Sequence, residues 1–143
     1  MNTKKDRDVI RILKDDGVIH NDFDEENKLI CNVEEIIKKN KNLKSWSKRL
    51  VNTESNSATI ISQMPGEGNR RHYHSNWNEW WYILDGEWEF EIEGKIYLIK
   101  KNELILIPKN LKHKITAVGD KPAIRLAVSR SDVDHIYEVN EEN

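Results

Sequence analysis

The feature that most constrains the fold is a series of short apolar segments within residues 47–129. Each segment is rich in β-branched and aromatic side chains, and turn-forming residues such as Asn, Gly, Pro and Asp separate it from the next. Because eight short strands at this spacing are typical of a small β-sandwich or barrel, the sequence predicts a mainly β fold. The eight segments that we expect to be strands are 47–53, 58–64, 79–84, 87–94, 95–99, 103–108, 113–118 and 123–129.

Two of the expected strands indicate how the faces of the sheets are covered. In residues 87–94, Trp88, Phe90 and Ile92 alternate with glutamates, which predicts a strand with one buried face. Residues 79–84, EWWYIL, do not alternate, so we expect both faces of that strand to be covered.

The beginning of the chain has helical rather than strand patterning. Residues 3–17 predict a short helix that has Thr3 as its N-cap and ends at Gly17. Residues 32–42 predict a second helix, because Asn32 is followed three residues later by a glutamate, which is the spacing of a capping box.

The chain therefore divides into two parts. We expect residues 1–44 to be an N-terminal helical extension that packs on a β-barrel domain formed by residues 45–143. The formal net charge of −2 gives no electrostatic reason to expect nucleic acid or a membrane as a partner, and no run approaches the ~20 apolar residues of a membrane span. The N-terminus lacks the apolar run of a signal peptide and the one cysteine, Cys31, cannot form an intrachain disulfide, so we expect a cytoplasmic protein.

Histidine and tryptophan are concentrated in residues 72–88, HYHSNWNEWWYILDGEW. His72 and His74 have the spacing that places both side chains on one face of a strand. Glu79 follows the turn-prone SNWN, so a hairpin would bring its carboxylate to the same interior. Two imidazoles and one carboxylate suit a divalent transition metal such as Fe, Mn, Ni, Zn or Cu. The residues fit equally well an aromatic core with incidental histidines, so the spacing alone leaves both interpretations open.

Two segments resemble the conserved motifs of the cupin superfamily. The first motif is matched by Gly66, five residues, His72-Tyr73-His74, four residues, Glu79, six residues and Gly86. The second motif is similar to residues 102–117, NELILIPKNLKHKITA, in which Pro108 and His113 stand at the proline and the last histidine of the family.

The second motif departs from the family pattern at three positions. Asn102 and Asn110 stand where the family has glycines, and Ala117 replaces an asparagine. Asn tolerates a positive φ better than most residues, so both Asn residues suit the same turns. None of the three positions is a metal-ligand position of the family.

The resemblance covers about residues 57–130 and implies a cupin-type double-stranded β-helix, or jelly-roll barrel, with a short N-terminal helical extension. It also implies a homodimer, since small cupin barrels commonly dimerise. An octahedral ion with four protein ligands keeps about two positions free for a substrate. The implied cofactor is one divalent transition metal ion (Fe, Mn, Ni or Zn), and its implied ligands are His72, His74, Glu79 and His113.

Several other side chains are candidates for the site. Arg70 shares the parity of His72, and its guanidinium matches an anionic group of a substrate, while Arg125 is a weaker candidate on another expected strand. Gln63 and Tyr82 are candidates to donate hydrogen bonds near the metal. Tyr82 and the carboxylate of Glu79 are the candidate catalytic groups for moving a proton.

The tryptophans and the tail allow further expectations. Trp81 should face inward close behind the metal-binding carboxylate, and Trp77 either covers the mouth of the pocket or is a surface aromatic; both are candidate substrate contacts. The tail resembles the closing strand and tail of cupin sugar-phosphate isomerases. Asp134 and His135 lie there, and a solvated tail is the favoured interpretation over a paired His–Asp at the barrel mouth.

Three functional hypotheses follow from the sequence and the resemblance. The favoured one is a metal-dependent enzyme that acts on a small, anionic, carbohydrate-, carboxylate- or phosphate-bearing substrate by Lewis-acid isomerase, epimerase or lyase chemistry. The second is a non-haem Fe(II) dioxygenase with the same ligands. The third is a binding module without turnover. The expected helices are too far apart for a helix-turn-helix, so a transcription regulator is disfavoured.

Overall fold

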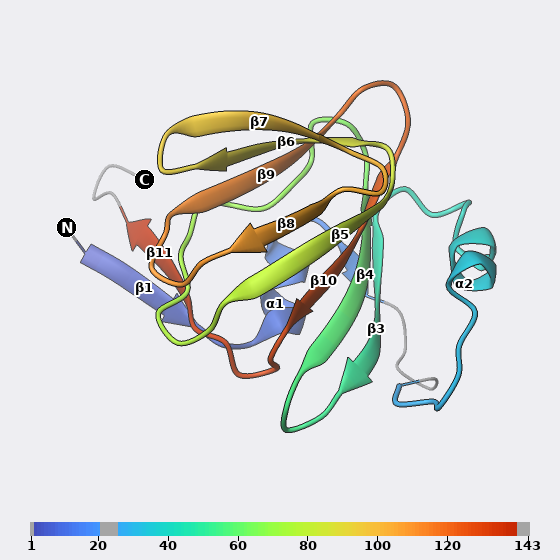
Figure 1. The fold of residues 1–143 in the computed structure, drawn as a ribbon, viewed down its shortest axis with the longest axis horizontal. Helices are drawn as coiled ribbons and strands as arrows, with labels where there is room; N and C mark the ends of the chain where they lie inside the picture. Colours follow the sequence, from blue (N-terminus) through green and yellow to red (C-terminus); the bar gives the residue numbers. More distant parts are fainter. Residues whose placement is uncertain (1, 21–25, 140–143) are drawn as a thin grey trace.

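The computed structural model describes residues 2–20 and 26–139, and strands dominate it (Figure 1). All eight strands expected from the sequence are confirmed, as β3 to β10. In chain order the elements are β1 (Asn2–Asp6), α1 (Val9–Asp15), β2 (Ile19–His20), α2 (Val33–Lys39), β3 (Trp46–Asn52), β4 (Ser57–Gln63), β5 (Glu79–Asp85), β6 (Glu87–Ile92), β7 (Lys95–Lys100), β8 (Leu104–Ile107), β9 (His113–Val118), β10 (Ala123–Ser129) and β11 (His135–Val139).

Two sheets face each other and form the expected jelly-roll barrel (Figure 1). The larger sheet has the strand order β2-β3-β4-β10-β5-β8, and the smaller has the order β7-β6-β9. The core between them includes Trp81 and Ile83 from β5, Trp88 and Phe90 from β6, and Ile115 from β9. The alternation in β6 is confirmed, because Trp88 and Phe90 are buried and Glu89 between them is exposed.

The prediction that both faces of β5 are covered was wrong for its outer face. Trp81 and Ile83 are buried, but Trp80 is 37% exposed and Tyr82 and Leu84 are partly exposed. The strand lies between β10 and β8, so its inner face is covered by the smaller sheet while much of its outer face meets solvent in the chain described. Consecutive aromatic residues therefore concealed an ordinary alternation of inner and outer positions.

The first expected helix starts later than the sequence predicted. Thr3 is not its N-cap, because residues 2–6 form β1, which pairs with β11 along five positions. The helix α1 begins after Asp8, whose carboxylate accepts a hydrogen bond from the backbone N–H of Arg11 at 3.1 Å. Pairing with a strand more than a hundred residues away overrides the local helical pattern, and local propensity cannot reveal it.

The second expected helix is confirmed as α2. Asn32 is its N-cap, and its side chain accepts a hydrogen bond from the backbone N–H of Glu35 at 3.0 Å. Ile36 packs with Trp46 and Leu50 in a core cluster on the outside of the larger sheet. No described helix has the length and apolar character needed to cross a membrane.

Three turns have a positive φ at a motif position: Asn102 and Asn110 in the second motif and Gly86 at the end of the first. Asn102 and Asn110 both have φ of 71°, so each adopts the left-handed conformation that the family's glycines would adopt. Gly86 has φ of 73°, and a Cβ atom there would lie 2.7 Å from Ala123 Cα. Close backbone approach and positive φ together explain the glycine between β5 and β6.

Candidate metal centre

Three of the expected ligands form a compact buried group. His72 and His74 precede β5, and His113 is the first residue of β9. One ring nitrogen from each of the three lies within 4.8 Å of the others. The ring centroids of His72 and His113 are 4.4 Å apart, and those of His74 and His113 are 5.0 Å apart. Three of the residues predicted from the sequence therefore lie close enough together to bind one ion.

The predicted hairpin between the histidines and Glu79 is wrong. His72 pairs instead with His113, through backbone hydrogen bonds of 3.1 and 2.9 Å, and Tyr73 pairs with Ile136 of β11. The histidine segment thus lies between β9 and β11, while Glu79 begins β5 in the larger sheet. The carboxylate reaches the histidines across the barrel rather than around a turn.

Backbone carbonyls fix the tautomer of each candidate ligand. The Nδ1 atom of His72 lies 2.7 Å from the carbonyl oxygen of Arg70, and that of His113 lies 3.0 Å from the carbonyl oxygen of Leu111. His74 Nδ1 lies 2.9 Å from the carbonyl oxygen of residue 134. Since a carbonyl only accepts, Nδ1 carries the proton and the neutral ring keeps its lone pair on Nε2.

The Nε2 atom of His113 is buried and has no hydrogen-bond partner in the described part of the chain. A buried acceptor without a partner is costly, and a metal ion would satisfy this atom. Imidazole nitrogens are also the donors that Fe, Ni and Zn favour. The residues present therefore fit a divalent transition metal.

Glu79 adjoins the histidine group through His74. Its Oε2 atom lies 2.9 Å from His74 Nε2, and its Oε1 atom accepts a hydrogen bond from Trp81 Nε1. Two lone pairs at 2.9 Å repel each other unless a cation, either a proton or a metal ion, lies between them. A proton on His74 Nε2 joins the two groups, and a bound metal ion could take the place of that proton.

The charges within the group follow from burial and from the neighbouring charges. Burial raises the pKa of Glu79, but the charge and hydrogen bond of His74 outweigh it and hold the pKa at about 2. Burial lowers the pKa of His74, and the Glu79 carboxylate more than reverses this. Burial and the neighbouring imidazoles lower the pKa of His72, and they lower that of His113 to about 4. At neutral pH, His72 and His113 are therefore neutral and Glu79 is ionised.

A fourth imidazole, His135, joins the cluster from β11. Its ring centroid lies 5.0 Å from that of His72 and 4.6 Å from that of His74, and its Nδ1 atom lies 3.1 Å from the carbonyl oxygen of Val133. Burial lowers its pKa to about 4. The favoured interpretation of a solvated tail was wrong, although the alternating HIYEV after Asp134 was a strand signal that could have placed this histidine.

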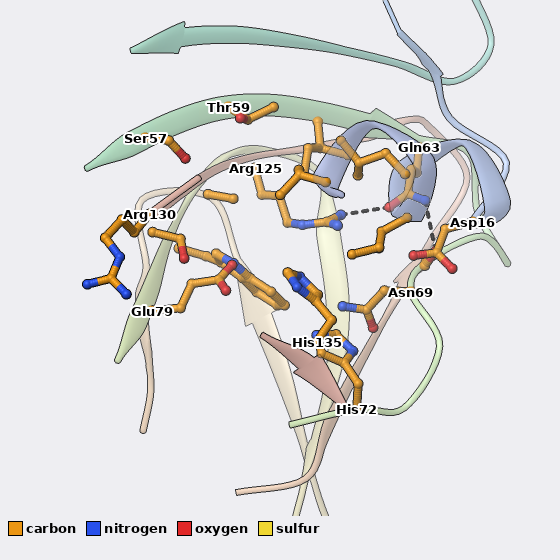
Figure 2. Close-up of a pocket in the computed structure, with 18 residues that line it drawn as sticks. Asp16, Ser57, Thr59, Gln63, Asn69, His72, Glu79, Arg125, Arg130 and His135 are labelled. Carbon is orange, nitrogen blue, oxygen red and sulfur yellow. Dashed lines mark hydrogen bonds between the residues drawn. The ribbon is translucent and has the colours of Figure 1, made fainter. Parts of the chain in front are cut away.

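A cavity of about 60 Å³ lies beside the histidines, with room for about four waters or a small ligand (Figure 2). Side chains from α1, β4, β5, β10 and β11 line it, and His72, Glu79, Trp81 and His135 are among them. The helix α1 contributes Val9, Ile12 and Leu13, and Asp16 directly after it also lines the cavity. The N-terminal extension is therefore part of the wall of the cavity, which the sequence did not indicate.

Arg125 is a buried positive charge in this cavity. Its side chain, on β10, lines the cavity with its guanidinium turned toward Gln63 in Figure 2, and the residue is 2% exposed. Its Nη1 atom donates a hydrogen bond to Gln63 Oε1 at 2.7 Å, and its guanidinium lies 5.1 Å from the Trp81 ring and 4.6 Å from the Trp88 ring. None of the ion pairs among the described residues includes it and its Nε atom has no hydrogen-bond partner, so the carboxylates of Glu79 and Asp16 act on it only through their charge. Burial lowers its pKa to about 10, so it remains charged at neutral pH.

The other candidate residues lie in different surroundings. Arg70 forms an ion pair with Asp16 at 2.7 Å, and its guanidinium carbon lies 4.5 Å from the centre of the Tyr137 ring. It is not among the residues that line the cavity, because the buried Asp16 after α1 holds it at the edge. Tyr82 points away on the outer face of β5 and donates a hydrogen bond to Asn102 Oδ1 at 2.9 Å.

Gln63, Trp81 and Trp77 complete the set of sequence candidates. Gln63 and Trp81 line the cavity and are fully or nearly fully buried. Trp77 lies at its edge, where the guanidinium of Arg130, a lining residue, is 4.6 Å from the indole ring. The structure thus brings Gln63, Trp81 and Arg125 together with the histidines and leaves Arg70 and Tyr82 outside.

Comparison with known proteins agrees with this geometry. The family model described as Cupin domain matches residues 59–129, which contain the three histidines and Glu79. The chain belongs to the cupin superfamily. This cupin fold is shared with a conserved protein with a double-stranded β-helix domain from Klebsiella pneumoniae, at a TM-score of 0.64 and 17% identity over 80% of this chain and 100% of that one.

Two further proteins are similar to smaller parts of this chain. A cupin-superfamily sugar phosphate isomerase from Silicibacter pomeroyi has a TM-score of 0.53 and 19% identity, over 59% of this chain and 57% of that one. A protein named polyketide synthase CurC from Streptomyces cyaneus is 30% identical over 59 residues, which are 41% of this chain. The match spans 38% of the length of that relative.

Proposed function

We propose that this cupin is a metal-dependent enzyme that acts on a small anionic substrate by Lewis-acid chemistry of the isomerase, epimerase or lyase type. The observation that carries the proposal is the Arg125 guanidinium, which is buried in the cavity with no carboxylate partner among the described residues. A buried charge is costly unless it is paired, and a bound anion supplies the missing partner. Arg125 would then hold the negative group of the substrate beside the histidines.

The ligands that we propose for the metal are His72, His74, Glu79 and His113. A divalent ion bound there would polarise a carbonyl or stabilise an enediolate of the substrate. The imidazoles would offer Nε2 lone pairs, because each Nδ1–H is already bonded to a backbone carbonyl. This arrangement fixes ring orientation before any ion binds.

Neighbouring side chains would orient the substrate and move its proton. Gln63 is anchored by its Nε2–H, which donates to the carbonyl oxygen of Gly68 at 3.0 Å, and its Oε1 atom holds Arg125. The guanidinium is thus positioned before an anion arrives, which reduces the entropic cost of binding. Glu79 lines the cavity as an ionised carboxylate, and we propose that it takes the proton when it is partly released from the metal and from His74, which hold its charge.

The relatives are compatible with this class of reaction. One of the structural neighbours is named a sugar phosphate isomerase, and a sugar phosphate carries the negative charge that Arg125 would recognise. Small hydroxy and oxo acids carry a similar charge and two oxygens that could chelate an ion. The cavity of about 60 Å³ favours the smaller members of these classes.

The test follows solvent deuterium into the substrate. Metal-loaded protein is incubated in D₂O with a panel of small sugar phosphates and hydroxy or oxo acids, and proton NMR reports exchange at the carbon next to the carbonyl. Exchange or product that is lost in Glu79→Gln and Arg125→Met supports the proposal. Consumption of O₂ without exchange would favour the Fe(II) dioxygenase instead. Binding of an anion with neither reaction would leave a binding module.

A further inference from the structure

Residues 5–7 and the segment just before β11 meet beside His74, and the contacts there differ from those of the other candidate ligands. His72 and His113 each donate Nδ1–H to a carbonyl two residues before them in the chain. His74 instead contacts the carbonyl oxygen of Asp134, sixty residues away. The orientation of His74 therefore depends on where the segment before β11 is held.

The carboxylate of Asp134 holds that segment. It is 4% exposed, accepts hydrogen bonds from Arg7 Nε and from Ser75 Oγ at 3.1 Å, and lies 3.6 Å from Lys5 Nζ. Ser75 directly follows His74, so one carboxylate ties the N-terminal segment to the ligand segment. A buried carboxylate with charged donors is a strong anchor.

We propose that Arg7 and Asp134 form a latch that positions His74 for metal binding. The inference rests on the proposed metal centre. Both residues lie outside the matched residues 59–129, so the segments before and after the matched region would supply an outer part of a site whose ligands lie inside it. Partners that orient a metal-binding imidazole commonly change metal affinity 10- to 100-fold when they are removed.

The chain offers a closely matched control. Arg11 pairs with Asp6, and in both Arg–Asp pairs the arginine side chain is 59% exposed and the aspartate side chain is 5% exposed. Asp6 lies on β1 opposite His135, yet its carboxylate bonds to Arg11 and to the backbone N–H of Asp8 rather than to the segment that holds His74. A variant that breaks the Arg11–Asp6 pair therefore removes a similar ion pair nearby and leaves the latch intact.

The experiment measures Co²⁺ affinity by chelator competition and records the visible spectrum of the bound ion. Wild type is compared with Arg7→Gln, Asp134→Asn, Arg7→Lys and the control Arg11→Gln, each first checked for folding by thermal unfolding. We expect about tenfold weaker binding and an altered Co²⁺ spectrum in Arg7→Gln and Asp134→Asn, partial recovery in Arg7→Lys, and wild-type values in Arg11→Gln.

Two results would overturn the latch alone. One is wild-type Co²⁺ affinity and spectrum in both Arg7→Gln and Asp134→Asn, and the other is an equal loss of affinity in Arg11→Gln. If wild type itself binds no Co²⁺, the proposed metal centre fails and the latch fails with it. The two failures are thus distinguishable in one set of measurements.

Discussion

Replacement of Arg125 by methionine tests whether its buried charge serves anion binding or the stability of the fold. Burial lowers the pKa of Arg125 to about 10, which corresponds to a penalty of about 3 kcal/mol on the charged form of the folded protein. Methionine removes that penalty but also removes the hydrogen bond to Gln63, worth about 1.5–3 kcal/mol, and cation–π contacts worth about 0.5–2 kcal/mol. These contributions nearly cancel, so we expect the free energy of unfolding to stay within about 2 kcal/mol of wild type.

Anion binding should respond very differently. Removing one partner of a buried charge pair costs at least about 2 kcal/mol, so affinity for inorganic phosphate or lactate should fall at least about 30-fold in Arg125→Met. Arg130→Met is the control, because Arg130 also lines the cavity but is paired with Asp132 and is partly exposed. Its effect should be no more than a few-fold.

The assay combines urea unfolding with titration calorimetry of the metal-loaded proteins. The expected pattern is near-normal stability with lost anion binding in Arg125→Met only. A loss of more than about 4 kcal/mol of stability with anion affinity retained would refute the reasoning, because it would make Arg125 a structural residue like one member of a buried ion pair.

Three other predictions address protonation, backbone geometry and assembly. Because the pKa of His74 is raised while those of His72 and His113 are lowered, metal binding at pH 5.5 should release about one proton, and none once the pH is well above the pKa of His74; calorimetry in two buffers measures this, and release of two or more protons would contradict it. Gly86→Ala should cost about 2–4 kcal/mol from positive φ and overlap with β10, whereas Gly94→Ala, with positive φ and no atom within 4 Å, should cost about 1 kcal/mol in urea unfolding. Trp80, Leu104 and Leu106 are exposed on the outer face of β5 and β8, so we expect a homodimer through this face that Leu106→Glu converts to a monomer in light scattering; a monomeric wild type would contradict this.

The strands of the barrel were predictable because local patterns reflect burial. Alternating Trp88, Phe90 and Ile92 defined β6, and the eight segments carried strand-forming residues between turn residues. The turns at Asn102 and Asn110 were also predictable, because asparagine tolerates a positive φ better than most residues. These features depend on short stretches of chain, which sequence patterns describe well.

Contacts between distant segments were not predictable. Because β1 pairs with β11, residues 3–6 form a strand where a helix was expected, and His135 of β11 joins the cluster. Parity placed Arg70 inward, but the ion pair with Asp16 holds it at the edge. Arg125, only a weaker candidate from the sequence, lines the cavity, because β10 lies inside the larger sheet between β4 and β5.

The metal content of the purified protein tests the central claim most directly. Plasma mass spectrometry of chain without a polyhistidine tag should find about one divalent transition metal ion per chain, and the double variant His72→Ala/His113→Ala should lose it. Absence of metal from wild type, even after reloading with each of Fe²⁺, Mn²⁺, Ni²⁺ and Zn²⁺, would contradict the claim. The histidines, Glu79 and Arg125 would then form a ligand pocket that works without a metal.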